Sequence, residues 1–134
     1  MPIDPGPEQT AAHAALADDE PIVAVNLLKY REWAAYEEPV DSPDVSGRHA
    51  YLRYATVTRQ LISQVGGGPV FTGNVALTFV GEPADDWDDI ACIRYPSPKA
   101  MRDMTEMPAY KDVLKHRTAA LERSVVLICR DWRK

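Results

Sequence analysis

Five polar side chains lie on or beside the apolar stretches of this sequence, and together they have the chemistry to bind a small molecule. They are Asn26, Tyr51, Tyr54, Arg94 and Arg117. An arginine fork neutralises a carboxylate through paired hydrogen bonds, while a tyrosine hydroxyl or an asparagine amide orients the rest of a ligand. We therefore interpret these residues as candidate ligand-binding groups for a small organic acid or an aromatic compound.

Two of these residues also have a structural interpretation. Asn26 interrupts the apolar run 22–28, and a buried amide without partners costs on the order of 1 to 3 kcal/mol. It is either a satisfied structural amide or a pocket group. Arg117 falls on the apolar stripe of a helix, between Leu114 and Leu121. Its guanidinium either reaches outward to water or meets an acceptor, for which Asn26, the tyrosine hydroxyls and a bound anion are candidates. We predict that it faces a pocket.

The sequence shows no pattern of metal ligands, and no nucleophile beside a base. Its histidines, His13, His49 and His116, include no pair four residues apart, so we expect no metal and no cofactor. We interpret His13 as a solvated helix residue, and His116 as a residue worth testing. The catalytic residues are unknown, because Ser97 is better explained as a helix N-cap before Pro98.

Apolar periodicity and breaker residues divide the chain into elements. The run 22–28 is nearly all apolar, as in a strand covered on both faces, and residues 46–65 follow the i, i+3, i+4 rule of an amphipathic helix. The other elements are an alanine-rich helix within 8–17, a strand over 70–80 with a bulge at 73–74, a strand over 89–95, a helix from Ser97 that restarts at Pro108, and a strand over 124–129.

This order predicts an α+β fold of the ferredoxin-like, split βαβ type (β-α-β-β-α-β), with a four-stranded antiparallel sheet and an N-terminal helical extension over residues 1–20. We expect the first and third strands to be central and parallel, with the fourth beside the first and the second beside the third. Residues 31–46 form a long connection, a kind that often serves as a lid, a binding loop or a subunit contact. We favour a surface loop pinned by Trp33 and Tyr36.

The strand order also tests whether the two cysteines can form a disulfide. Cys92 falls on the third strand and Cys129 on the fourth, with the first strand between them. Two strand spacings are roughly 9 to 10 Å, which exceeds the reach of a disulfide. We therefore expect two free, buried thiols, as suits a reducing compartment.

Length and charge exclude several classes of protein. A chain of 134 residues suits a single domain, 1–134. Its net charge of −5 comes from acids scattered through the sequence, so we expect no nucleic-acid partner, which would require a basic patch. We expect no membrane partner either, because no apolar segment is long enough to span a bilayer and the acidic start does not resemble a secretory signal. We predict a cytoplasmic protein.

Several short pieces of sequence, taken together, resemble a known family. They are residues 25–30, Ser46–Gly47, Ala50–Tyr51, Tyr54, Gly66–Gly67, Trp87–Asp88, residues 95–97, Tyr110 and Arg117. In order and spacing they resemble the uncharacterised DUF1330-type family of the dimeric α+β barrel superfamily. The resemblance implies a homodimer in which two sheets pack face to face, with a ligand-sized space between sheet and helices. That superfamily includes cofactor-free monooxygenases, small isomerases, haem-degrading enzymes and ligand-sensing domains, and the family has no established catalytic residue.

Two function classes follow. In the first, the five candidate residues converge on a pocket for a small organic acid or aromatic ligand, and the protein is an enzyme that needs no cofactor. In the second, the protein is a non-catalytic dimeric binding or accessory module, and the same residues are structural amides, tyrosines and arginines. A cavity of a few hundred cubic ångströms lined by these groups would favour the first class.

Overall fold

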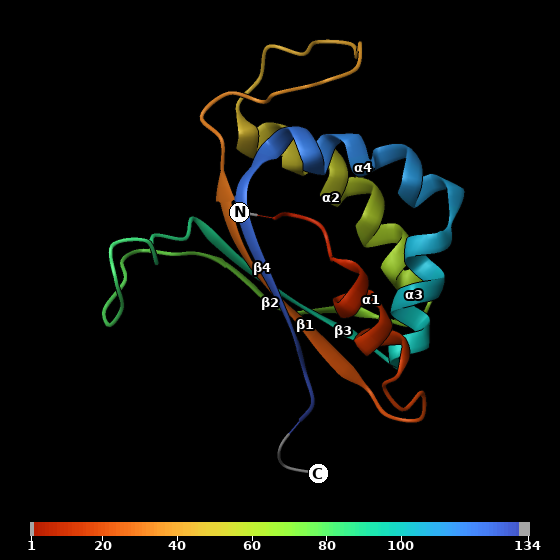
Figure 1. The fold of residues 1–134 in the computed structure, drawn as a ribbon. Helices are drawn as coiled ribbons and strands as arrows, with labels where there is room; N and C mark the ends of the chain where they lie inside the picture. The colour runs from red at the N-terminus through yellow and green to blue at the C-terminus, as the bar shows by residue number, and fades with distance from the viewer. Residues whose placement is uncertain (1, 132–134) are drawn as a thin grey trace.

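The computed structural model describes residues 2–131, and its elements follow the predicted β-α-β-β-α-β order after one N-terminal helix. They are α1 (Pro7–Ala14), β1 (Ile22–Tyr30), α2 (Gly47–Gln64), β2 (Gly68–Asn74), β3 (Asp89–Tyr95), α3 (Pro98–Glu106), α4 (Pro108–Ala120) and β4 (Leu121–Cys129). Helices α2, α3 and α4 lie on one side of the sheet (Figure 1). Among the described residues, no helix is long and apolar enough to span a bilayer.

The sheet has the strand order β2-β3-β1-β4, as expected for a ferredoxin-like fold. Every neighbouring pair is antiparallel, so the prediction that the two central strands are parallel is wrong. The helical crossovers join β1 to β2 and β3 to β4, and it is these non-adjacent strands that run the same way. The strand that lies between each such pair runs in the opposite direction.

The predicted helix boundaries are confirmed by their caps. The Oγ atom of Ser46 accepts a hydrogen bond from the backbone N–H of His49 (3.0 Å), and Ser97 caps α3 in the same way. Such caps satisfy backbone donors that the first turn of a helix leaves unpaired. The helical segment between β3 and β4 is interrupted at Met107, and α4 begins with Pro108 in its first turn. Helix α2 ends before Gly66, whose φ of +85° suits only glycine.

Two strands differ from the sequence prediction. β2 ends at Asn74 instead of Val80, and residues 75–80 leave the sheet. Its register shifts between Pro69 and Phe71 instead of at 73–74, because proline has no N–H to give to the ladder. β4 begins at Leu121, directly after α4 and three residues before the predicted start.

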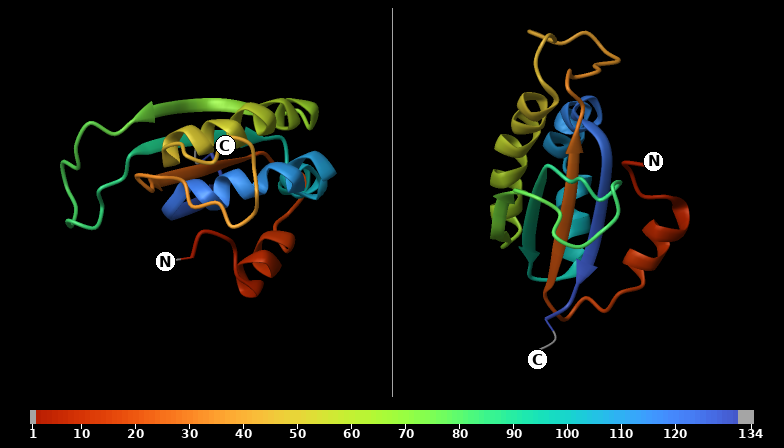
Figure 2. Two further views of the ribbon diagram at one scale, coloured as in Figure 1. Left: turned by 90° about the horizontal axis from the view of Figure 1, so that it is seen from above. Right: turned by 90° about the vertical axis from the view of Figure 1, so that its left-hand side faces the viewer.

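Side chains alternate along each strand, so the sheet has a helix-facing side and an open face. The core on the helix-facing side contains Ile22, Ala24, Leu28 and Tyr95 from the sheet with Leu61, Ile62 and Met104 from the helices. By the strand registers, the open face carries Val23, Val25, Leu27, Phe71, Ile90, Cys92, Val125, Leu127 and Cys129. The open face lies opposite the helical layer (Figure 2). Its centre is apolar, and the cations Lys29, Arg94 and Arg123 lie toward its ends.

The two thiols lie on this open face, on opposite sides of β1. Cys92 pairs with Val25 and Cys129 pairs with Val23, as the predicted strand order requires. Both cysteines are free, but they are half-buried rather than buried as predicted. The reason is that the side of the sheet on which they lie has no covering helix.

The N-terminal helical extension packs beside the helical layer. Arg102 on α3 donates hydrogen bonds to the carbonyl oxygen of His13 (3.2 Å) and to the carboxylate of Asp18 (3.0 Å). His13 is half-buried, so its assignment as a solvated residue is wrong. Burial, together with the charge of Arg102, lowers the pKa of this histidine. Its helix α1 is also shorter than expected and ends at Ala14.

Candidate functional site

Asn26 lies on the helix-facing side of β1, between Ala24 and Leu28. Its side-chain Nδ2 donates hydrogen bonds to the carbonyl oxygens of Ala24 (3.2 Å) and Ala91 (3.0 Å). Ala91 stands opposite Asn26 on β3. Both hydrogen bonds are to backbone, so the structure favours the structural-amide interpretation, in which Asn26 ties the two central strands together.

Tyr51 and Tyr54 point from α2 into a row of aromatic rings that runs through the interior. Their ring centroids are 5.3 Å apart, and the row continues to Tyr30 (5.6 Å from Tyr51) and Tyr110 (5.9 Å from Tyr54). The hydroxyls of Tyr54 and Tyr110 are hydrogen-bonded at 3.1 Å. Burial raises the pKa of Tyr51 to about 12, although the charge of Arg117 acts in the opposite direction. Burial also raises the pKa of Tyr54, so Tyr51 and Tyr54 stay protonated at neutral pH.

Arg117 is buried on α4, with 9% of its side chain exposed, so it does not reach outward to water. Its Nη1 donates to the carbonyl oxygen of Ile3 (2.7 Å) and to the carboxylate of Asp4 (3.2 Å). The acceptor is therefore the N-terminal segment, which is none of the three candidates expected from the sequence. A buried guanidinium needs such partners, because an unpaired buried charge is strongly destabilising.

The structure brings four of the five predicted residues to the helix-facing side and places the fifth elsewhere. Arg94 pairs with Val23 and Gly68, so its side chain belongs to the open face. Among these four, the positive charge of Arg117 acts to lower the pKa values of both Tyr51 and Tyr54. Whether any of the five contacts a ligand stays a prediction.

A hollow of about 540 Å³ lies elsewhere, between the 31–46 loop and the outer side of α2 and α4. It is lined by Pro39, Val40, Asp41, Arg53, Lys115 and His116. None of the five residues predicted from the sequence lines it. Arg53 and Lys115 carry positive charge and Asp41 carries negative charge, so the lining is net positive and favours an anion.

Tyr36, His116 and Arg53 form a hydrogen-bonded chain at this hollow. The Tyr36 hydroxyl lies 2.7 Å from Nδ1 of His116, and the two rings meet edge to face at 84°. Nη1 of Arg53 donates to the same hydroxyl oxygen (3.2 Å). Because a guanidinium only donates, the phenol proton is free to point at the imidazole nitrogen. The long loop is therefore pinned through Tyr36, whereas Trp33, expected to share that role, is 66% exposed.

The protonation state of His116 suits this arrangement. Burial lowers the pKa of its imidazole, and the charges of Lys115 and Arg53 lower it further, against a smaller opposite effect of Asp112. The imidazole is therefore neutral at pH 7, with Nδ1 available as an acceptor. Lys115 has no hydrogen-bond or ion-pair partner within residues 2–131, so its ammonium is available to a ligand.

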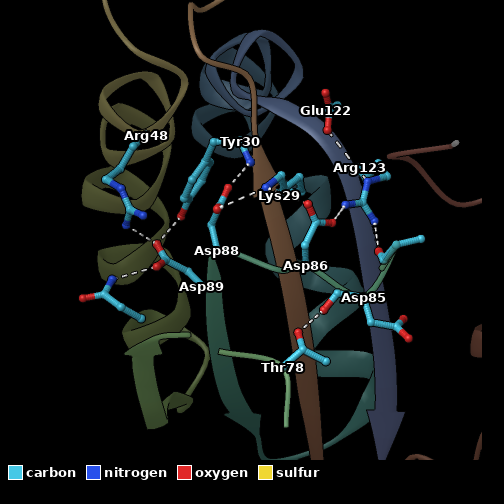
Figure 3. Close-up of polar contacts among 12 residues, drawn as sticks. Lys29, Tyr30, Arg48, Thr78, Asp85, Asp86, Asp88, Asp89, Glu122 and Arg123 are labelled. Atoms are coloured by element: carbon cyan, nitrogen blue, oxygen red, sulfur yellow. Dashed lines mark hydrogen bonds and ion pairs between the residues drawn. The ribbon is translucent and has the colours of Figure 1, made fainter. Parts of the chain in front are cut away.

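A second polar cluster, at the start of β3, is fully occupied by structural bonds. Asp89 accepts hydrogen bonds from Tyr30 (2.6 Å), Arg48 (2.6 Å) and Asn74 (2.7 Å) (Figure 3). Burial raises the pKa of Asp89, but these three bonds together hold it below its ordinary value. The carboxylate links β1, α2 and β2 to β3, which is a structural role. Within residues 2–131, no three His, Cys, Asp or Glu side chains come together as metal ligands.

The model of a domain of unknown function, DUF1330, matches residues 39–130. The chain belongs to the DUF1330 family. One solved relative of this DUF1330 protein is RPA0582, a protein of unknown function from Rhodopseudomonas palustris. It is 30% identical, covers 98% of this chain and 98% of its own, and superposes with a TM-score of 0.89. Among curated proteins, none matches this chain.

More distant structures share only the fold with this DUF1330 protein. A dabb family protein with a ferredoxin-like fold from Mesorhizobium loti is 9% identical, with 81% of this chain and 94% of its own covered and a TM-score of 0.50. The hydroxynitrile lyase from Passiflora edulis is 13% identical, with 87% and 97% covered and a TM-score of 0.58. The dabb family protein confirms the ferredoxin-like class of fold, and at these identities neither structure carries information on activity.

Proposed function

We propose that this protein is a homodimer that binds a small organic anion in the hollow between the 31–46 loop and helices α2 and α4. The observation that carries the proposal is the meeting of Arg53, Lys115 and His116 around one hollow of about 540 Å³. Sites for small molecules typically measure roughly 300 to 1,000 Å³. The ammonium of Lys115 forms no ion pair within the described chain, so an incoming carboxylate does not need to displace an acid from it.

The walls of the hollow suit an anion with an apolar or aromatic body. Pro39 and Val40 supply apolar surface on the loop side. Lys115 and the free donors of Arg53 supply hydrogen bonds to a carboxylate on the helix side. We therefore propose the same class of ligand as the sequence predicts, a small organic acid or aromatic compound. The residues proposed to bind it are different ones.

The hydrogen-bonded pair of Tyr36 and His116 can act as an acid–base group, so the proposal includes catalysis without a cofactor. A neutral imidazole that accepts from a phenol at 2.7 Å can take up a proton from a bound substrate through that phenol or directly. Arg53, which also bonds the phenol oxygen, stabilises negative charge that develops there. We therefore assign proton transfer on a small organic acid as the reaction class.

A non-catalytic dimeric binding or accessory module is the second candidate, and one observation favours it. Asn26, Tyr54 and Arg117 each have hydrogen-bond partners within the protein itself, which is what structural residues require. The two candidates differ in one measurement. An enzyme exchanges a carbon-bound hydrogen next to the carboxylate of a bound organic acid with deuterated water, at a rate that His116→Gln abolishes. A binding module leaves that hydrogen unexchanged.

The dimer part of the proposal rests on the open face of the sheet. A contiguous apolar face of this kind is rarely left to solvent by a monomeric protein. Phe71 is 59% exposed and Leu127 is 51% exposed on that side. Light scattering at micromolar concentration is expected to give twice the monomer mass of 14.9 kDa, and a stable monomer would contradict the proposal.

Anion binding is tested with a thermal-shift panel of small carboxylates, phenols and their uncharged amides at constant ionic strength. A ligand that binds only the folded protein raises its melting temperature as its concentration rises. We expect carboxylates, but not the matching amides, to do this, and we expect Lys115→Gln to lose the shift. The control Lys99→Gln removes an exposed cation of α3 that is paired with Asp103, and it should keep the shift. A panel without any concentration-dependent shift would contradict the proposal.

A further inference from the structure

The connection from β2 to β3, residues 75–88, is an arm with an exposed apolar tip. Leu77 is 68% exposed, Phe79 is 92% exposed and Val80 is 87% exposed. Exposure of single apolar residues is ordinary, but three large ones within four positions of one projecting segment form the kind of patch that marks an interaction site. The second half of the alternation that predicted a strand over 70–80 therefore consists of apolar residues that are largely exposed in their own subunit.

The arm is nevertheless held in one conformation by its own polar contacts. Thr78 donates a hydrogen bond from Oγ1 to the carbonyl oxygen of Asp85 (2.5 Å), and the side chain of Asp85 accepts from the backbone N–H of Glu82 (2.8 Å). The backbone N–H of Asp85 bonds back to the carbonyl oxygen of Glu82 (2.9 Å). A segment braced in this way presents its apolar side chains instead of collapsing them onto the subunit.

The base of the arm is anchored to the open face of the sheet. Arg123 on β4 donates to the carbonyl oxygen of Ala84 (2.7 Å), forms an ion pair with Asp86, and lies over the ring of Trp87 with its Cζ 4.8 Å from the centroid. Lys29 on β1 also pairs with Asp86 (3.2 Å). Figure 3 shows Lys29 and Arg123 on either side of Asp86, at the ends of the two strands. They aim the arm to the side of the sheet that has no helices.

We infer that the arm of each subunit packs against the other subunit of the dimer, with Leu77, Phe79 and Val80 buried on the partner. Two views show the arm on the open-face side: in Figure 1 it projects away from the helices, and in the right-hand view of Figure 2 it stands in front of β3, β1 and β4. A second copy that covers the open face therefore meets the arm. A twofold axis gives both arms the same contact.

Charge complementarity agrees with a second copy as the occupant. Arg94 is exposed on the open face and has no partner in the described part of the chain, and the carboxylate of Glu82 near the arm tip has none either. The apolar tip of the arm therefore matches the apolar part of the partner's open face. The unpaired carboxylate of Glu82 matches the unpaired guanidinium of Arg94. A stable interface buries about 800 Å² of accessible surface on each partner. The apolar tip of the arm adds buried surface to that supplied by the open face.

This inference rests on the dimer of the proposed function, and sedimentation equilibrium of the full chain separates the two. The double variant Phe79→Ser/Val80→Ser removes the apolar tip, and Leu52→Ser, which changes a 56% exposed leucine of α2, is the matched control. We expect the arm variant to dimerise at least about tenfold more weakly than the wild type, since centrally buried aromatic and aliphatic anchors dominate such interfaces. The control should dimerise as the wild type does, and circular dichroism should show both variants folded.

Each other outcome overturns a defined part. A wild-type dimer with an unchanged dissociation constant in the arm variant overturns the arm contact and leaves the dimer standing, with the arm free for a different macromolecule. A monomeric wild type overturns both. Hydrogen exchange gives an independent reading: amides 75–81 should be protected in the concentrated dimer and lose that protection on dilution, and an arm that exchanges freely in the dimer contradicts the inference.

Discussion

Arg117 connects the helical layer to the start of the chain. Its guanidinium is close enough to Tyr51 and Tyr54 to lower their pKa values, and its Nη1 donates hydrogen bonds to Ile3 and Asp4. The carbonyl oxygen of Ile3 would lose its hydrogen-bond donor if the guanidinium were removed. At the scale of single residues, this pairing accounts for an arginine at a position where the helix stripe requires an apolar group.

We predict that Arg117→Met destabilises the protein by about 1 to 3 kcal/mol, because it leaves a partly buried acceptor unpaired. Urea denaturation followed by circular dichroism measures the free energy of unfolding. Arg59→Met is the control: Arg59 is exposed on the same helical layer, and its replacement should change stability by no more than about 0.5 kcal/mol. A fully stable Arg117→Met variant would mean that the arginine serves a ligand and not the N-terminal segment.

His116 gives the protein a predictable response to pH. Burial and nearby cations lower the pKa of its folded form below 6.5. The unfolded chain therefore binds a proton near pH 6.5 that the folded protein does not yet bind, and stability falls as the pH drops through this region. Burial also lowers the pKa of His13, so the losses of stability that the two histidines cause at low pH add together.

We expect His116→Gln to lose less stability than the wild type between pH 7.5 and pH 5.5, even though it breaks the bond to Tyr36 and is less stable at both. Urea titrations at the two pH values provide the comparison. His49→Gln is the control, because this histidine lies at the exposed start of α2. An equal loss of stability in the wild type and in His116→Gln would show that the imidazole does not titrate abnormally.

At the scale of elements, the entry into α2 depends on a close approach of backbones. The N–H of Gly47 bonds to the carbonyl oxygen of Arg31 (3.1 Å). A Cβ atom at position 47 would overlap that carbonyl and lie 2.7 Å from the carbonyl oxygen of Ala120. Both neighbours are backbone atoms, which cannot rotate away. Glycine is therefore required where the long loop, α2 and the end of α4 meet.

Gly47→Ala is expected to cost about 1 to 3 kcal/mol or to prevent folding, as overpacking does in a well-packed core. Gly68→Ala is the matched control, because no atom lies within 4 Å of a Cβ built at Gly68. Thermal melts of the two variants, run side by side, test the pair. Equal melting temperatures would mean that the loop and helix end can move apart at little cost.

Elements could be predicted where neighbouring residues determine them. The caps at Ser46 and Ser97 each involve a residue three positions away, and the apolar run of β1 needs no knowledge of its partners. The end of β2 could not be predicted, since apolar alternation is the same in a strand and in an exposed arm. The hollow could not be predicted either, because Tyr36 and His116 are 80 positions apart.

The acceptor of Arg117 was missed for the same reason, since Ile3 is 114 positions away in the sequence. Two features of the sequence point toward the hollow: His116 flanks the apolar face of its helix, and Tyr36 is an aromatic residue that can pin the long loop. Only the tertiary structure shows that these two side chains meet. The convergence of distant polar residues is set by helix packing, which one sequence does not display.

At the scale of the whole molecule, the open face determines how the thiols react. Cys92 and Cys129 lie on that face and are half-buried in one subunit. In the proposed dimer, the partner covers them. The chemistry of each cysteine should therefore report on assembly, because only an accessible thiolate reacts.

We predict that both thiols react slowly with a thiol reagent at high protein concentration and faster after dilution below the dissociation constant of the dimer. After unfolding, two free thiols should be counted. The expected rate difference disappears in a variant that does not dimerise. Reaction at one rate at all concentrations would contradict a dimer through the open face, and recovery of an intramolecular disulfide would contradict the separation of the cysteines by β1.

The most direct test of anion binding at the hollow is a nuclear magnetic resonance titration of the labelled protein with benzoate, and with benzamide as its uncharged analogue. We expect benzoate to cause saturable shifts at the amides of Val40, Asp41, Lys115 and His116. Benzamide should cause much smaller shifts, and Lys115→Gln should weaken the benzoate response while Lys99→Gln leaves it unchanged. Saturable shifts around Tyr51 and Arg117 instead, or equal responses to both compounds, would contradict the proposed site.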